Sequence, residues 1–197
     1  MAGRVGCLVF VVGLCIAAVG GWNYIGGGDR RPADGVHLSP DGREIIISGR
    51  FEQGLERRFR KLLDASSNAR VVRLFSAGGY VKVAGAIRND IRERRMDTIV
   101  SGVCASACTI AFMAGERRLF VKGARLGFHS FTLGGKESDR TTREMELHYG
   151  YFGTNQNFID RIALTPATAI WFPTAEELVN AQVVTEVLAP SSKSRWW

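Results

Sequence analysis

Short β-branched runs alternate with amphipathic segments along most of this chain, and that alternation restricts the fold more than any other feature. Arg43–Ser48 (REIIIS) and Val71–Phe75 (VVRLF) have the composition of strands. Residues 51–64 and 81–94 carry apolar side chains at helical spacing instead. Strands separated by helices predict an α/β domain whose sheet is mostly parallel. With 197 residues, 46% of them hydrophobic, the chain is long enough for one such domain with a substantial core.

The same pattern continues toward the C-terminal end of the chain. Thr174 and Glu177 have the spacing of a capping box, which predicts the start of a last short helix. Further strands are expected over Thr98–Ser101, Arg118–Val121, Arg125–Phe131 and Val183–Leu188, and further helices over Ser106–Ala114 and Glu137–Ile162, the second of these broken near Gly150 and Gly153.

An uncharged apolar run, Val5–Ile25, follows Arg4 at the N-terminus, in the layout of an export signal. The run just reaches the roughly 20 residues of a spanning helix, and Trp22 and Tyr24 stand where an interfacial belt is expected. Ala18-Val19-Gly20 also suits a cleavage site, so an uncleaved anchor, which we favour, and a cleaved signal peptide both fit. The bulk of the chain is then expected beyond the membrane, and secreted if the run is removed.

Composition divides the chain into four parts. Residues 1–25 are the expected signal-anchor or transmembrane segment, 26–41 a linker rich in glycine, proline and charge, 42–190 the folded domain, and 191–197 an exposed tail. The net charge is +7 and the pI about 9.6. A nucleic-acid partner is one interpretation of this charge. The arginines are spread through helical segments rather than interleaved with aromatic residues, so we expect no nucleic acid and a basic surface near anionic lipid.

Cys104 and Cys108 are the only cysteines outside the N-terminal run, in which Cys7 and Cys15 are most simply small hydrophobic residues. Exported compartments permit disulfides, and two helical residues four positions apart have α-carbons about 6 Å apart, within the disulfide range. A Cys104–Cys108 disulfide and two buried free thiols both fit. No other set of Cys and His residues has the spacing of a metal site, so no metal and no other cofactor are expected.

Three short stretches place reactive or permissive residues where elements meet. Ser76-Ala77-Gly78-Gly79 leads from a strand into a helix, which suits either an ordinary turn or backbone N–H groups that approach an anion. Ser106 begins a buried helix, as an N-cap or as a nucleophile supported by the helix dipole. His129 lies in an apolar strand, as a satisfied core residue or as a base. His37 and His148 are weaker candidates, one in the linker and one in a polar helical stretch.

Together these stretches resemble the ClpP/crotonase-like superfamily, and specifically the ClpP-type serine peptidases. The resemblance runs from about Gly42 to Leu188, and the cysteine-flanked serine with the N-terminal apolar run is most similar to exported ClpP-like bacterial proteins. It implies a spiral of β-β-α units with a mostly parallel sheet, preceded here by an N-terminal apolar helix. Five segments carry it in the order of the family, REIIISGRF, VVRLFSAGGYVKVAGAI, GVCASACTIAFMAG, ARLGFHSFTLGG and FPTAEELVNAQVVTEVL.

The resemblance implies a role for each residue that matches the family's motifs. Ser106 takes the place of the nucleophile, and His129 takes the place of the general base. The backbone N–H groups of Gly79 and Ala107 take the oxyanion-hole positions. The Gly78-Gly79 pair is then expected because a side chain at Gly79 would crowd the acyl oxygen.

The family's third residue, an aspartate, has no counterpart here. No acid lies between Arg161 and Thr174, and the aligned position falls near Pro166. Because that group orients the imidazole, the sequence predicts either a Ser–His dyad or a degenerate site. Asp139, Asp160 and Glu176 are the acids that could reach back to the imidazole, although none of them is favoured, and a less favoured Ser–Lys pair would use Lys82 or Lys122.

The expected function is that of a membrane-anchored serine hydrolase, and more specifically a peptidase. In a bacterium it would sit in the inner membrane with its domain on the periplasmic side, and it would act without ATP because a cytosolic unfoldase cannot reach it. Its partners would be peptide or unfolded protein substrates, the membrane, and further copies of the chain in a trimer or ring, as the superfamily implies. The alternatives are a catalytically degenerate binding or scaffold module on the same fold, and crotonase-type acyl-CoA chemistry.

Overall fold

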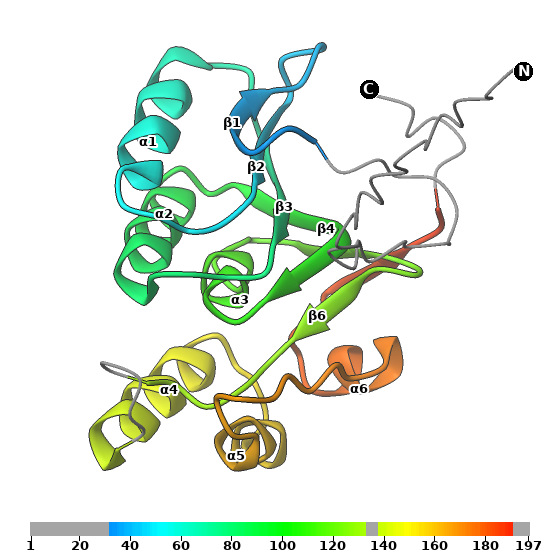
Figure 1. The fold of residues 1–197 in the computed structure, drawn as a ribbon. Helices are drawn as coiled ribbons and strands as arrows, with labels where there is room; N and C mark the ends of the chain where they lie inside the picture. The colour runs from blue at the N-terminus through cyan, green and yellow to red at the C-terminus, as the bar shows by residue number, and fades with distance from the viewer. Residues whose placement is uncertain (1–31, 133–137, 191–197) are drawn as a thin grey trace, which may run out of the picture.

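The computed structural model describes residues 32–132 and 138–190, which form one mixed α/β domain around a seven-stranded sheet (Figure 1). The strands follow the order β1-β2-β3-β4-β5-β7, and β6 pairs with β4. Every pairing is parallel except that of β1 with β2. The sheet is therefore mostly parallel, as the alternation of strands and helices predicts. The strands are β1 (Gly35–Leu38), β2 (Glu44–Ser48), β3 (Val71–Ser76), β4 (Asp97–Ala105), β5 (Arg118–Val121), β6 (Arg125–Gly127) and β7 (Glu186–Leu188).

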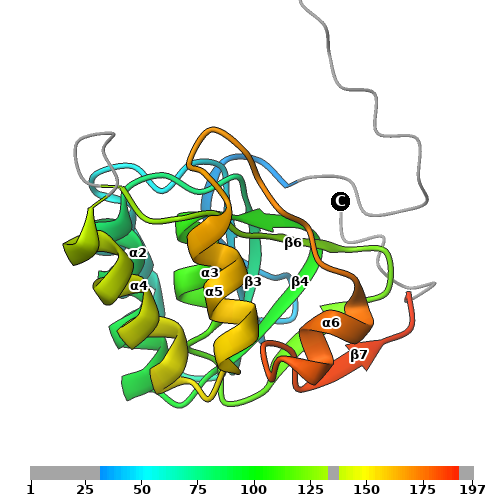
Figure 2. The same ribbon diagram turned by 90° about the horizontal axis from the view of Figure 1, so that it is seen from below.

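Six helices are present in the described residues, and they fall into two groups. In Figure 1, α1, α2 and α3 lie to one side of the central strands, while α4, α5 and α6 lie below them. Seen from below in Figure 2, α4 lies in front of α2 and α5 in front of α3, so α3 is enclosed between other elements. All six of its residues are buried. The helices are α1 (Leu55–Ala65), α2 (Val81–Glu93), α3 (Ala107–Phe112), α4 (Asp139–Tyr151), α5 (Gln156–Leu164) and α6 (Ala175–Asn180).

The first helix shows how the sequence pattern produces packing. Leu55, Phe59 and Leu63 recur every fourth residue, so their side chains share one face of α1, and all three are buried. Burying each side chain of this size stabilises the fold by about 1.5–3 kcal/mol. On the polar side, Arg60 Nε lies 3.1 Å from both carboxylate oxygens of Asp90, which is 5% exposed, so α1 is also joined to α2 by a charge-assisted contact.

The central strand β4 brings the three motif-bearing stretches together. Its first half pairs with β5 through Thr98–Val100, and its second half pairs with β6 through Val103–Ala105. On its other edge, Cys104 of β4 is the register partner of Ser76, the last residue of β3. The carboxyl ends of β3, β4 and β6 therefore meet at one edge of the sheet, which is where open parallel sheets bind ligands.

Several element boundaries differ from the expected ones. The strand expected over Thr98–Ser101 extends to Ala105, because β6 gives its second half a hydrogen-bonding partner. The helical stretch expected over residues 137–162 is two helices, α4 and α5, with the break near Gly150 and Gly153 that the sequence predicts. Gly153 has a φ of 80° in the turn between them, and the side chain of Asn155 accepts a hydrogen bond from the N–H of Phe158 to start α5. The capping box of Thr174 with Glu177 is confirmed.

The expected linker is structured in part. Gly35–Leu38, within the segment assigned to a linker, forms β1 and pairs with the whole of β2 except its first residue. Backbone hydrogen bonding to the edge of the sheet outweighs the glycine- and proline-rich composition around it. Within the described ranges no helix is both long enough and apolar enough to span a bilayer. The predicted apolar helix over residues 1–25 and the tail over 191–197 lie outside the described residues. The spiral of β-β-α units that the resemblance implies stays a prediction.

Candidate active site

Ser106 occupies a sharp turn between β4 and α3. Its backbone has φ 55° and ψ −129°, a positive φ that residues other than glycine rarely adopt. Its N–H donates to the carbonyl of Gly127 at 2.9 Å, which fixes the turn against the end of β6. The side chain makes no capping hydrogen bond to α3, so the N-cap interpretation of the sequence does not hold. The strained backbone instead projects the hydroxyl away from the helix that follows.

The Ser106 hydroxyl points at His129. The distance from Oγ to His129 Nε2 is 2.7 Å, and the other ring nitrogen, Nδ1, lies 2.7 Å from the carbonyl oxygen of Ser130. A carbonyl oxygen only accepts hydrogen bonds, so Nδ1 carries the ring proton and Nε2 accepts from the serine. Both side chains are half-buried, which leaves the pair open to solvent on one side.

Backbone contacts on both sides of His129 hold its ring in place. Phe128 and Trp171 exchange two hydrogen bonds of 2.8 and 2.9 Å, and the N–H of Ser130 donates to the carbonyl of Thr165 at 2.8 Å. The Phe128 ring also packs edge-on against Phe158, with centroids 5.2 Å apart. The segment after α5 therefore anchors the histidine on both sides, although it offers no carboxylate to the ring.

The Gly78-Gly79 turn lies directly beside the serine. A Cβ placed on Gly78 would lie 2.7 Å from Ser106 Cβ and 3.0 Å from Ala107 N. A Cβ on Gly79 would instead lie 2.5 Å from the carbonyl oxygen of Phe51. This corrects the sequence-based reason for the second glycine, because the Phe51 backbone, rather than an acyl oxygen, excludes a side chain there.

Two backbone N–H groups at this edge have no acceptor in the described part of the chain. Phe51 holds the turn through its N–H to the carbonyl of Gly78 (2.9 Å) and its own carbonyl to the N–H of Tyr80 (2.8 Å). The intervening N–H of Gly79 takes part in neither bond. Ala107 is the first residue of α3, where an N–H has no partner within its helix. Both donors are therefore free to bind a negatively charged oxygen.

A disulfide encloses the serine. Cys104, in β4, and Cys108, in α3, are bonded, with α-carbons 5.3 Å apart, and both are fully buried. The bridge ties the strand before Ser106 to the helix after it. A second contact holds the same helix, since Thr109 Oγ1 lies 2.7 Å from the Ser106 carbonyl and 2.8 Å from the buried Tyr149 hydroxyl. Burial raises the pKa of Tyr149, so its hydroxyl stays protonated.

No carboxylate hydrogen-bonds His129 within the described residues. Asp160 accepts a hydrogen bond from Gln156 at 2.7 Å, and Asp139 and Glu176 lie in the first turns of α4 and α6. The alternative bases of a Ser–Lys pair, Lys82 and Lys122, are both exposed, and no hydrogen bond joins either to Ser106. Across the same residues, no three His, Cys, Asp or Glu side chains gather where they could hold a metal ion.

The structural groups that sequence reasoning missed are backbone atoms. The carbonyls of Ser130, Thr165 and Trp171 position the histidine, but any residue type supplies a carbonyl. The only available signal was indirect, namely the absence of an acid near Pro166 in a segment that otherwise follows the family pattern.

Comparison with known proteins identifies the fold. No protein-family model matches the chain, and no curated protein sequence matches it. Among solved structures, ClpP1 from Listeria monocytogenes superposes with a TM-score of 0.63 at 20% identity, and a point mutant of the same protein with 0.64 at 19%. Each match covers 79% of this chain and 96% of the other.

The chain therefore has the fold of ClpP-like peptidases, as the motif order predicts. At this level of identity the likeness shows the fold alone.

Proposed function

We propose that this protein is a serine hydrolase, and more specifically a peptidase, in which Ser106 is the nucleophile and His129 the general base. The observation that carries the proposal is the 2.7 Å contact between Ser106 Oγ and His129 Nε2, made by a serine with a strained backbone at the carboxyl edge of the sheet. A structural serine needs neither the strain nor an imidazole partner.

The proposed reaction follows from the direction of these hydrogen bonds. Ser106 Oγ attacks the carbonyl carbon of the substrate and its proton passes to His129 Nε2. The N–H groups of Gly79 and Ala107 donate to the oxyanion that forms, and each such donor lowers the barrier by about 3 kcal/mol. His129 then gives the proton to the leaving amine. A water, deprotonated by the same ring, hydrolyses the acyl-serine and restores the hydroxyl.

The Ser130 carbonyl does part of the work of the missing aspartate. By accepting from Nδ1 at 2.7 Å it fixes the tautomer in which Nε2 is free to accept a proton. A wrong tautomer costs about 10⁴ in rate in triad enzymes, so this part of the role is large. A carbonyl bears only a partial charge, however, and stabilises the imidazolium less than a carboxylate does. We therefore expect slow but real turnover.

We further propose that the domain works outside the cytoplasm, anchored by the apolar N-terminal run and without ATP. The disulfide between Cys104 and Cys108 supports this placement, because such bonds persist in exported compartments. Its substrates are then peptides or loosely folded chains, and association into a trimer or ring is part of the proposal by resemblance alone. The second candidate, a degenerate binding module, is favoured by one observation, the absence of a carboxylate at His129 in the described residues.

A fluorophosphonate probe tests the proposal on the full chain in mild detergent. We expect labelling of the wild type, and a loss of at least a thousandfold in labelling rate in Ser106→Ala and His129→Ala. Ser67→Ala removes an exposed serine next to α1 and is the matched control, which keeps the wild-type rate. Protein that is folded by circular dichroism yet unlabelled would favour the binding module.

A further inference from the structure

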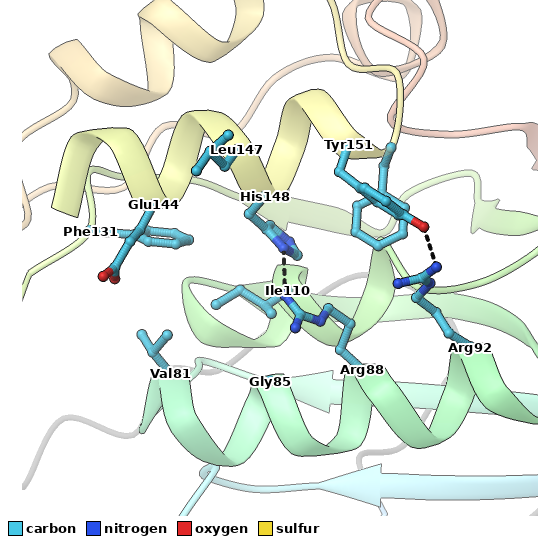
Figure 3. Close-up of a pocket in the computed structure, with 11 residues that line it drawn as sticks. Val81, Gly85, Arg88, Arg92, Ile110, Phe131, Glu144, Leu147, His148 and Tyr151 are labelled. Atoms are coloured by element: carbon cyan, nitrogen blue, oxygen red, sulfur yellow. Dashed lines mark hydrogen bonds between the residues drawn. The ribbon is translucent and has the colours of Figure 1, made fainter. Parts of the chain in front are cut away.

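A cavity of about 400 Å³ lies between α2 and α4 (Figure 3). Three of its lining residues follow the proposed catalytic groups closely along the chain. Val81 lies two residues after Gly79, Ile110 one helical turn after Ser106, and Phe131 two residues after His129. Val81 and Phe131 lie at one end of the cavity, beside Glu144, and Ile110 lies in its middle (Figure 3). Because Val81 and Phe131 follow Gly79 and His129 so closely along the chain, we take this end as the one nearest the proposed reacting atoms.

The cavity then follows one face of α2 away from that end. Val81, Gly85 and Arg88 all line it, at positions i, i+4 and i+7. At 1.5 Å per residue, Arg88 lies about 10 Å further along the helix than Val81. A Cβ on Gly85 would meet nothing within 4 Å, so the missing side chain leaves open space in the middle of the cavity.

Arg88 is a half-buried cation without a carboxylate partner in the described residues. Its guanidinium donates to Nδ1 of His148 at 3.2 Å and to the side-chain oxygen of Asn89 at 2.9 and 3.1 Å. Burial and the nearby Arg92 lower its pKa, but a guanidinium remains charged at any physiological pH. A charge removed from water in this way gains from an anionic ligand.

His148, on the same wall, has one ring nitrogen without a hydrogen-bond partner in the described residues. The side chain is 8% exposed, and its Nε2 has no hydrogen-bond partner in the described structure. Because Arg88 only donates, Nδ1 must accept, and the ring proton is on Nε2. Burial and the Arg88 charge lower the pKa of His148 to about 3, so the ring is neutral and does not compete with Arg88 for an anion.

The remaining charged groups at the cavity are already engaged. Arg92 donates to the Tyr151 hydroxyl and stacks on that ring at 4.5 Å. Glu144, the acid in the lining, is exposed and pairs with Arg140 at 2.9 Å. In Figure 3 it lies beside Phe131 at one end of the cavity, while the Arg88–His148 contact lies in the middle and Arg92 with Tyr151 at the other end. The part of the cavity around Arg88 is therefore positive, and the walls are largely apolar.

We propose that this cavity is a substrate subsite for a carboxylate carried on an apolar peptide, with Arg88 as the group that binds it. The identity of the ligand as a substrate rests on the proposed function, whereas the binding site does not. An extended peptide advances about 3.4 Å per residue, so the stretch of cavity between Val81 and Arg88 corresponds to roughly three residues of substrate. Both a free C-terminus and an acidic side chain supply that group.

Binding to the full chain carrying Ser106→Ala tests the proposal without hydrolysis. Three apolar hexapeptides with a neutral N-terminal fluorophore are compared by anisotropy. One has a free C-terminal carboxylate, one a C-terminal amide, and one an amide with a single internal glutamate. We expect a carboxylate peptide to bind about tenfold more tightly than the neutral amide, as suits one charge-assisted contact. The two carboxylate peptides distinguish a terminus from a side chain.

Substitutions in the cavity show where the preference arises. Arg88→Gln should abolish the tenfold difference and Arg88→Lys should keep part of it. Gly85→Leu fills the open middle and should weaken all three peptides. Arg57→Gln removes an equal charge from the exposed face of α1, where the Arg57 side chain is 81% exposed, and should leave the preference intact. Circular dichroism verifies the fold of each variant.

Three outcomes would overturn the subsite. These are an unchanged preference in Arg88→Gln, no binding of any peptide up to about 1 mM, or a Gly85→Leu variant that changes the oligomeric state but not peptide binding. The last outcome would assign the cavity to contacts between copies of the chain. If the protein prefers carboxylate peptides but the fluorophosphonate probe does not label it, the subsite is retained and the hydrolase is rejected. If the probe labels the protein but no carboxylate preference is found, the hydrolase is retained and the subsite is rejected.

Discussion

The two histidines that lie near α3 differ in how their ring nitrogens are used. His129, at what we propose is the catalytic edge of the sheet, is half-buried and has a partner on each nitrogen, Ser106 Oγ and the Ser130 carbonyl. His148, in the cavity between α2 and α4, is buried, accepts from Arg88 on one nitrogen and has no partner on the other. The contacts of His129 leave its Nε2 ready to accept a proton. The contacts of His148 keep its ring neutral, so it does not accept one.

This difference teaches how the protein divides its polar groups. At the catalytic edge the polar side chains are satisfied internally, and the unsatisfied donors are the N–H groups of Gly79 and Ala107. In the cavity the groups open to a ligand belong to side chains: the Arg88 guanidinium, which has no carboxylate partner in the described residues, and the unpartnered Nε2 of His148. Under the proposed function, chemistry that is common to many substrates is assigned to backbone atoms, and recognition of one kind of substrate to side chains that substitution can alter.

Gly78→Ala should break the catalytic edge with the largest effect. The new Cβ would lie 2.7 Å from Ser106 Cβ, in a residue whose φ is 103°. Overpacking and the unfavourable φ together should destabilise the fold by about 3 kcal/mol. Urea unfolding measures the loss, and the rate of fluorophosphonate labelling should fall with it.

Gly123→Ala is the matched control for this change. Gly123 also has a positive φ, 98°, but a Cβ there would meet nothing within 4 Å. Its cost should be about 1 kcal/mol, the backbone contribution alone. Equal losses in the two variants would show that the close approach of Gly78 to Ser106 has no energetic importance.

Removing the disulfide should produce the next largest effect, again at the catalytic edge. The double change Cys104→Ala and Cys108→Ala opens a short loop around Ser106, and closing such a loop stabilises a protein by about 2 kcal/mol. Thermal or urea unfolding measures the loss, and a reductant should weaken the wild type but not the double variant. Detection of free thiols at both positions in the native protein, by peptide mapping, would contradict the bond.

The cavity should respond through pH, with a loss that is smaller than that of the disulfide at pH 6 and similar to it at pH 5. The pKa of His148 is lowered to about 3 in the folded protein, against an ordinary value of 6.5, so the unfolded state binds the extra proton between these values. Stability is therefore complete above pH 6.5 and falls below it, by about 1 kcal/mol at pH 6 and about 2 kcal/mol at pH 5. Urea midpoints across this range measure the slope.

His148→Gln isolates this contribution, because its side-chain oxygen can still accept from Arg88 while the group no longer titrates. The difference in unfolding free energy between wild type and variant should shrink as the pH falls from 7 to 5. A constant difference would mean that His148 titrates in the folded protein as it does in the unfolded chain, and the contrast between the two histidines would be lost.

Sequence reasoning was most successful where a motif ends a strand. Ser76–Gly79, Ser106 and His129 each follow a strand, and in a parallel sheet such positions come together. It failed where tertiary contacts decide. Gly35–Leu38 looks like linker until β2 supplies a pairing partner. Nor did the sequence around His148 indicate burial, since the polar stretch next to it conceals contacts with Phe131 and Phe152, which lie on either side along the chain.

The Ser130 carbonyl also determines how this site responds to mutation. The group that orients His129 is encoded by no codon in particular, because every amino acid at position 130 brings the same oxygen. A point mutation can delete the acid of a conventional triad, but none can delete this acceptor. It is lost only when the main chain moves, for instance when the hydrogen bonds that Ser130 and Phe128 make with Thr165 and Trp171 are disrupted. Selection on the Ser130 carbonyl therefore acts on the position of the main chain and not on which amino acid stands at position 130.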